Sequence, residues 1–136
     1  MSAPLPAPVP AVGVVCLRGD EVLLIRRGQP PRQGEWSLPG GRIEPGERAI
    51  DAALRELREE TAVEAEITGL LDVVDGLFPS AGRHYVLIDY GAHWLSGEPV
   101  AGDDAIEARF VPLDQVAALI DWSETRRIIA LAVERR

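Results

Sequence analysis

Residues 40–63, GGRIEPGERAIDAALRELREETAV, decide the fold of this 136-residue chain. A glycine pair and a Pro–Gly turn precede a segment with apolar residues at helical spacing, which predicts a loop followed by a helix over residues 47–61. The positions expected to face the core are Ile50, Ala53, Leu54 and Leu57, which follow the i, i+3, i+4, i+7 rule. The predicted helix therefore carries an apolar stripe along one side.

Three glutamates gather near the end of this predicted helix. Glu59 and Glu60 follow Glu56 by three and four residues, so the carboxylates share one face, about 120° from the apolar stripe. Like charges at this spacing cost roughly a few tenths of a kcal/mol per pair, and a helix C-terminus favours cations. A hard divalent cation such as Mg²⁺ binds carboxylate oxygens and would explain the arrangement. The alternative is a solvated face with Arg55 and Arg58 as counter-charges.

The residues around the glutamates resemble the signature of the Nudix hydrolase family. That signature is G-x5-E-x7-R-E-U-x-E-E-x-G-U, with U apolar, and eight of its nine specified positions agree here. The matching residues are Gly41, Glu47, Arg55, Glu56, Leu57, Glu59, Glu60 and Val63. The departure is Ala62, which stands where the family usually has the glycine that ends the helix, so a less sharp helix end is expected.

The resemblance implies an α+β protein in which a mixed β-sheet is sandwiched between α-helices. It also implies Mg²⁺-dependent hydrolysis of a pyrophosphate bond in a nucleoside diphosphate linked to another group, with Mn²⁺ able to replace Mg²⁺. Carried over position by position, it makes Glu56, Glu59, Glu60 and the backbone carbonyl of Gly40 metal ligands, Arg55 the residue that orients the glutamates, and Gly41 and Glu47 structural residues of the motif.

The general base that would accept the proton of the attacking water is expected in a loop after the motif. Asp103, Asp104 and Glu107 are the candidates, and Asp104 is favoured. The alternative is that these residues only form a turn before a strand.

Substrate contacts are expected at the end of a strand that precedes the motif. Arg26 and Arg27 are adjacent in that strand and so point to opposite faces, and one of them should face the motif and grip phosphates. Trp36, Phe78 and Tyr85 could stack on a base, although core packing is the alternative for each.

The substrate suggested by the resemblance is ADP-ribose or a related nucleotide sugar. Members of the family that act on ADP-ribose often have a proline about sixteen residues beyond the motif, where this chain has Pro79. Hydrolysis of (d)NTPs for nucleotide-pool clean-up is the close alternative. A Nudix-fold sensor that binds a nucleotide without cleaving it is the second alternative, and the retained glutamates argue against it.

Apolar and β-branched runs outside the motif predict the remaining elements. The expected strands cover residues 11–17 and 22–25 as a hairpin, then 36–38, 67–78, 84–95 and 108–113; the expected helices cover residues 114–120 and a final helix capped by Ser123. Residues 1–10 carry spaced prolines and are expected to be an extended, weakly ordered leader. Residues 11–136 are expected to form a single Nudix domain.

The charge balance narrows the function further. The chain has 22 acidic residues against 14 arginines, no lysine and a net charge of −8, which argues against a nucleic-acid polymer as partner. Residues 44–66 alone hold eight acids and three arginines, as a cation site would.

The lone Cys16 excludes an intramolecular disulfide and is expected in the core. Without a signal sequence or a membrane-spanning apolar run, a cytoplasmic protein is expected, and a homodimer is our working hypothesis.

Overall fold

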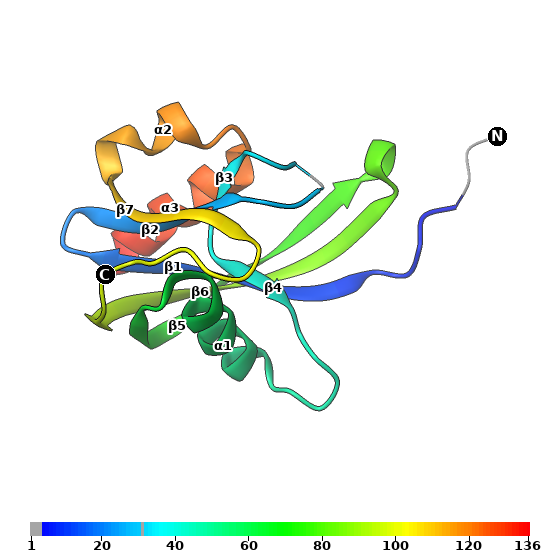
Figure 1. The fold of residues 1–136 in the computed structure, drawn as a ribbon. Helices are drawn as coiled ribbons and strands as arrows, with labels where there is room; N and C mark the ends of the chain where they lie inside the picture. The colour runs from blue at the N-terminus through cyan, green and yellow to red at the C-terminus, as the bar shows by residue number, and fades with distance from the viewer. Residues whose placement is uncertain (1–3, 31) are drawn as a thin grey trace.

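The computed structural model describes residues 4–30 and 32–136, which form a mixed seven-stranded sheet with α1 on one face and α2 and α3 on the other (Figure 1). The strands are β1 (Val9–Arg18), β2 (Glu21–Arg27), β3 (Trp36–Ser37), β4 (Gly40–Arg42), β5 (Glu64–Phe78), β6 (Arg83–Ser96) and β7 (Ala105–Pro112). The helices are α1 (Ala49–Thr61), α2 (Val116–Leu119) and α3 (Ser123–Arg135), with the 3-10 turns η1 (Pro79–Ala81) and η2 (Leu113–Gln115). The predicted α+β sandwich is confirmed.

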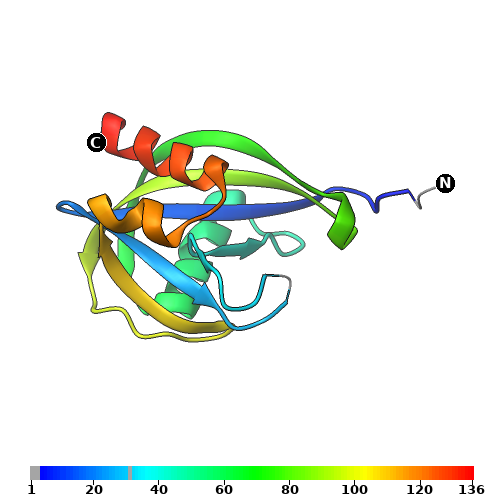
Figure 2. The ribbon, with the colours of Figure 1, turned by 90° about the horizontal axis from the view of Figure 1, so that it is seen from above.

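A fork between β1 and β2 is the feature of the sheet that positions the site. The predicted hairpin is confirmed, but its strands share only the registered pairs Leu17↔Val22 and Arg18↔Glu21 before they diverge (Figure 2). Beyond that point β4 pairs with the freed edge of β1, and β3 pairs with the freed edge of β2. The peptide between β3 and β4 lies in the fork, where the Val14 N–H donates to the Pro39 carbonyl at 3.0 Å.

The sheet has an apolar core on each face. The core beneath α1 consists of Val12, Val14, Cys16, Leu23, Ala52, Ala53, Leu57, Val63, Ala65, Ala92 and Phe110. The core beneath α2 and α3 consists of Val15, Leu17, Val22, Leu24, Val74, Val111, Val116, Ile120, Ile128, Ile129 and Ala132. Cys16 is fully buried, as expected. Burying a side chain as large as that of Leu57 stabilises the fold by roughly 1.5–3 kcal/mol, so the core that contains it fixes α1 firmly against the sheet.

The predicted core stripe of α1 is wrong in part. The helix begins at Ala49 rather than at residue 47, Ile50 is 37% exposed, and Leu54 is only half-buried. Ala52 is buried in their place, and so is Glu60, which is 5% exposed. The helix is therefore rotated about its axis relative to the prediction. Glu60 of its acidic face points into the protein, at a position where helical periodicity alone predicts an apolar residue.

Element boundaries also differ at both ends of the chain. β1 begins at Val9, so the last two residues of the expected leader pair with β6, while residues 1–3 lie outside the described residues. At the start of α3 the N-cap position belongs to Trp122, with no side-chain capping hydrogen bond, so the prediction that Ser123 caps this helix is wrong.

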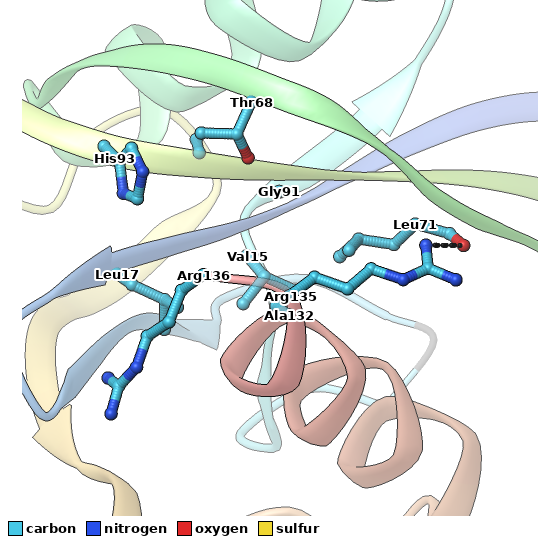
Figure 3. A pocket seen from close by; sticks show the side chains of 10 residues that line it. Val15, Leu17, Thr68, Leu71, Gly91, His93, Ala132, Arg135 and Arg136 are labelled. Carbon is cyan, nitrogen blue, oxygen red and sulfur yellow. Dashed lines mark hydrogen bonds between the residues drawn. The ribbon is translucent and has the colours of Figure 1, made fainter.

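The end of α3 is tied to the sheet beside a small cavity of about 40 Å³ that β1, β5 and β6 also line (Figure 3). There the guanidinium of Arg135 donates to the Leu71 carbonyl at 3.3 Å. Arg136 donates to the carbonyl of Gly19 at 2.9 Å. No helix in residues 4–30 and 32–136 is both long and apolar enough to cross a bilayer.

The C-terminus of α1 is sharp even though it lacks the usual glycine. Ala62 adopts the left-handed conformation with φ 61° and ψ 12°, and its N–H donates to the Arg58 carbonyl at 2.9 Å. A residue with a Cβ pays roughly 1–2 kcal/mol for this conformation, which glycine adopts readily. The chain therefore keeps the turn that the family signature requires at a cost in stability.

Replacing this alanine tests that cost. Ala62→Gly should raise the free energy of unfolding by up to about 1 kcal/mol, because relief of the left-handed strain exceeds the added entropy of the unfolded chain, and should raise Tm by roughly 2–5 °C. Ala130→Gly, at an exposed position inside α3, is the matched control and should lower stability by about 1 kcal/mol. Thermal unfolding followed by circular dichroism measures both, and a lower Tm for Ala62→Gly would contradict the strain argument.

Candidate active site

Glu60 is held inside the fork by the backbone of β4. Its Oε1 accepts a hydrogen bond from the Gly40 N–H at 2.7 Å. Gly40 in turn pairs with Gly13 of β1, and a Cβ at Gly40 would collide with the Val12 carbonyl. Only glycine therefore fits at the position that orients the Glu60 carboxylate.

Glu56 is packed against the next residue of β4. Its side chain is 12% exposed, and a Cβ on Gly41 would lie 2.6 Å from its Cδ. The glycine pair at the start of the motif thus gives two carboxylates of α1 close access to the backbone of β4. Glu59, one turn away, stays exposed, so the predicted single acidic face is divided between the interior and solvent.

Arg55 connects the loop before α1 to the acidic residues on it. Its Nε and Nη2 donate to the two carboxylate oxygens of Glu47 at 2.7 and 2.9 Å. Its Nη1 donates to Glu56 at 2.8 Å and to Glu59 at 3.2 Å. A fifth hydrogen bond, from Nη2 to the Arg42 carbonyl at 3.1 Å, fixes the end of β4. One guanidinium therefore sets the geometry of the loop and of two glutamates.

The electrostatics of the cluster favour a cation. Burial, together with the neighbouring charges of Glu56 and Asp103, raises the pKa of Glu60 to about 8, despite the opposing Gly40 hydrogen bond and the charge of Arg27. Burial likewise raises the pKa of Glu56, with Arg55 opposing. The hydrogen bond from Arg55 lowers the pKa of Glu47, which stays ionised. Several carboxylates are thus held close together at a cost that positive charge would offset.

Asp103 completes the cluster from a loop distant in sequence. Carboxylate oxygens of Glu56, Glu59 and Asp103 lie within 4.8 Å of one another. Such an all-oxygen donor set suits a hard cation such as Mg²⁺. Asp103 has φ 53°, and no equivalent group within residues 4–30 and 32–136 includes Asp104, which sequence reasoning favoured.

Backbone hydrogen bonds hold the loop that carries Asp103 next to the glutamates. The last carbonyls of α1, those of Glu60 and Thr61, accept hydrogen bonds from the N–H groups of Gly102 and Val100 at 3.1 and 2.9 Å. These carbonyls have no partner within the helix, so the loop satisfies them. On its other side the loop is fixed by the Gly28 N–H, which donates to the Asp104 carbonyl at 2.7 Å.

A cavity of about 1110 Å³ opens beside the cluster and receives only some of the predicted substrate contacts. Of the two adjacent arginines, Arg27 lines it, as do Trp36, Phe78 and Tyr85. Arg26 does not line the cavity. It donates to the Gly34 carbonyl at 2.9 Å and to the Glu107 carboxylate at 3.3 Å, so Arg26 and Glu107 bind each other outside the cavity.

Comparison with known proteins identifies the family. The family model described as "NUDIX domain" matches residues 7–132. The chain belongs to the NUDIX family. This confirms the family resemblance seen in the sequence, and the sandwich of sheet and helices agrees with it.

Three relatives illustrate the range of the match. An "ADP-ribose pyrophosphatase" of Methanocaldococcus jannaschii is 35% identical over 112 residues, covering 82% of this chain and 66% of that protein. The crystal structure of a "MutT NUDIX hydrolase" from Burkholderia pseudomallei has a TM-score of 0.80 at 30% identity and covers 93% of this chain and 98% of that one. The NUDIX domain of Shewanella oneidensis NrtR, solved in complex with ADP ribose, has a TM-score of 0.82 at 27% identity and covers 96% and 89%. The chain spans 66% of the first curated relative and 45% of the next two.

Sequence reasoning missed one residue of the Nudix cavity, Asp89. It lies in β6, where alternate residues Arg83, Tyr85, Leu87 and Asp89 all line the cavity. Burial raises the pKa of Asp89 to about 6, with repulsion from Asp72 adding to the effect and Arg127 opposing it. A lone acid in the middle of an apolar strand was the available signal.

Proposed function

We propose that this Nudix domain hydrolyses the pyrophosphate bond of a nucleoside diphosphate linked to another group, with ADP-ribose or a related nucleotide sugar as substrate. The observation that carries the proposal is the oxygen cluster of Glu56, Glu59 and Asp103 beside a cavity of about 1110 Å³. A relative named ADP-ribose pyrophosphatase and a structural neighbour solved with ADP ribose support this substrate class.

The proposed metal is Mg²⁺, with Mn²⁺ able to replace it. Its proposed ligands are Glu56, Glu59, Glu60 and the Gly40 carbonyl. The close carboxylate oxygens of Glu56 and Glu59, and the repulsion between Glu56 and Glu60, support a hard divalent ion at these residues. When bound, such an ion neutralises the pyrophosphate, acidifies a water molecule and stabilises the leaving phosphate.

The remaining residues position the carboxylates or bind the substrate. Arg55 fixes Glu56 and Glu59, and the Gly40 N–H fixes one oxygen of Glu60, so the carboxylates are in place before substrate binds. Arg27 lines the cavity beside Glu60, and its guanidinium is proposed to bind the diphosphate. Trp36, with the Arg109 guanidinium 4.9 Å from its ring centre on one face, offers an aromatic surface for the nucleoside.

We assign the general base to Asp103 in place of Asp104. Asp103 has a carboxylate oxygen beside those of Glu56 and Glu59, the region in which the attacking water must be activated. The loop that carries it is fixed on both sides by backbone hydrogen bonds. A carboxylate held in this way can accept the water proton without a large movement of the loop.

A substrate panel tests the proposed function. Purified protein should hydrolyse ADP-ribose to AMP and ribose 5-phosphate in the presence of Mg²⁺ or Mn²⁺, and chelation should stop the reaction. Glu60→Gln should reduce kcat by roughly 100-fold, because it removes a charge that holds the ion while keeping the shape of the side chain. Glu66→Gln, at an exposed position of β5, is the matched control and should leave kcat unchanged.

The same panel decides between the proposed substrate and its rivals. Dinucleoside polyphosphates and (d)NTPs are assayed beside ADP-ribose, and we expect the highest kcat/KM for ADP-ribose. The (d)NTPs are the second candidate, because the family resemblance of the sequence also includes enzymes of nucleotide-pool clean-up, and a preference for them would replace ADP-ribose. Binding of a nucleotide with no cleavage of any member of the panel would contradict the enzyme and favour a sensor.

Two neighbouring aspartates test the assignment of the base. Asp103→Asn should lower kcat by roughly 100-fold with little change in KM, because an amide cannot accept the proton of the water. Asp104→Asn is the matched control, one residue away in the same loop, and should retain kcat close to that of wild type. Steady-state kinetics at saturating metal measures both variants. A larger loss in Asp104→Asn than in Asp103→Asn would return the role to Asp104.

A further inference from the structure

Asp89 is a buried carboxylate that has no role in the mechanism above. It is 6% exposed, in the middle of β6, and lines the same cavity as the glutamates. In the sheet it stands opposite Gly13, and a Cβ at position 13 would collide with its Oδ1. The missing side chain at Gly13 is therefore what makes room for the Asp89 carboxylate.

No hydrogen bond from residues 4–30 or 32–136 reaches this carboxylate. The charges that act on it are those of Asp72 in β5, which repels it, and Arg127 in α3, which attracts it. Arg127 is already bound to Asp72 at 3.1 Å and to Glu124 at 2.7 Å. Within the same residues no side-chain oxygen is both sealed from solvent and unpaired, so the Asp89 carboxylate opens on the cavity.

The location of Asp89 relative to the glutamates suggests which part of a substrate it meets. Gly13 pairs with Asp89 on one side and with Gly40, the residue that holds Glu60, on the other. Asp89 shares the cavity with Leu38 and Leu87, which pack on the α2 and α3 face of the sheet, whereas Glu60 belongs to α1 on the opposite face. Because Asp89 and Glu60 line the same cavity, a nucleotide whose phosphates contact the glutamates would place its nucleoside against Asp89.

A charged carboxylate beside apolar side chains is costly unless a ligand supplies hydrogen-bond donors. Two oxygens side by side match two adjacent donors. We propose that Asp89 selects the nucleoside of the substrate by accepting two hydrogen bonds from such a pair, either the cis-diol of the ribose or the N–H and amino edge of a guanine-type base. This inference rests on the proposed function, because it assumes that a nucleotide occupies the cavity.

Binding of the product nucleotides, measured by calorimetry without added metal, tests the inference apart from catalysis. The pair AMP and 2′-deoxy-AMP differs in the diol, and the pair GMP and IMP differs in the amino group. Wild type should bind the complete member of one pair at least about tenfold more tightly, since a hydrogen bond to a charged group is lost in the other member. Asp89→Asn should reduce that preference to about threefold or less.

Controls separate recognition from folding. Asp89→Asn keeps the side-chain shape and removes a desolvated charge, so its Tm should equal or exceed that of wild type; Asp89→Ala is a second variant with the same expected loss of preference. Asp75→Asn, at an exposed position of β5, should keep the wild-type preference.

The outcomes distinguish a ribose diol from a base edge as the donor, and they distinguish failure of this inference from failure of the proposed function. Loss of the AMP preference assigns Asp89 to the ribose, and loss of the GMP preference assigns it to the base edge. Equal preferences in wild type and Asp89→Asn, or no preference in wild type, would overturn the inference. Hydrolysis of the substrate panel by wild type shows separately whether the proposed function holds.

Discussion

The hydrogen bond from the Gly40 N–H to the Glu60 carboxylate, 2.7 Å long, is the contact around which this molecule is organised. It requires β1 and β2 to separate so that β4 can pair with β1, and it requires glycine where β4 meets β1. It also turns α1 so that an acid, rather than an apolar side chain, faces the sheet. The two apolar cores supply the free energy that holds this buried carboxylate in place.

Charge and backbone polarity are balanced around that contact by separate parts of the chain. Arg55 neutralises the loop and the outer glutamates through five hydrogen bonds. The open carbonyls at the end of α1 are satisfied by the loop that carries Asp103, so the same bonds that end the helix deliver a further carboxylate. The negative charge that remains at the inner glutamates is what a divalent cation would offset.

Local patterns predicted the hairpin, α1 and the grouping of the motif glutamates, because periodicity and the motif spacing are properties of neighbouring residues. The sandwich was predicted from the resemblance to the Nudix family. The rotation of α1 was not predictable, since Ile50 and Leu54 satisfy the helical pattern as well as Ala52 does. Asp103 and Asp104 are equivalent in sequence, and only the tertiary hydrogen bonds of Gly102 and Gly28 distinguish them. The position of Asp89 in the cavity was not predicted, because the space for its carboxylate is made by Gly13, which is far away in the chain.

Direct titration with Mn²⁺, followed by electron paramagnetic resonance, tests whether the acids of α1 hold a divalent cation. Wild type should remove free Mn²⁺ from solution and release it to excess Mg²⁺. The double variant Glu59→Gln with Glu60→Gln, folded by circular dichroism, should bind Mn²⁺ at least about tenfold more weakly, because two ligand charges are lost. Equal Mn²⁺ affinity in wild type and the double variant would contradict the claim.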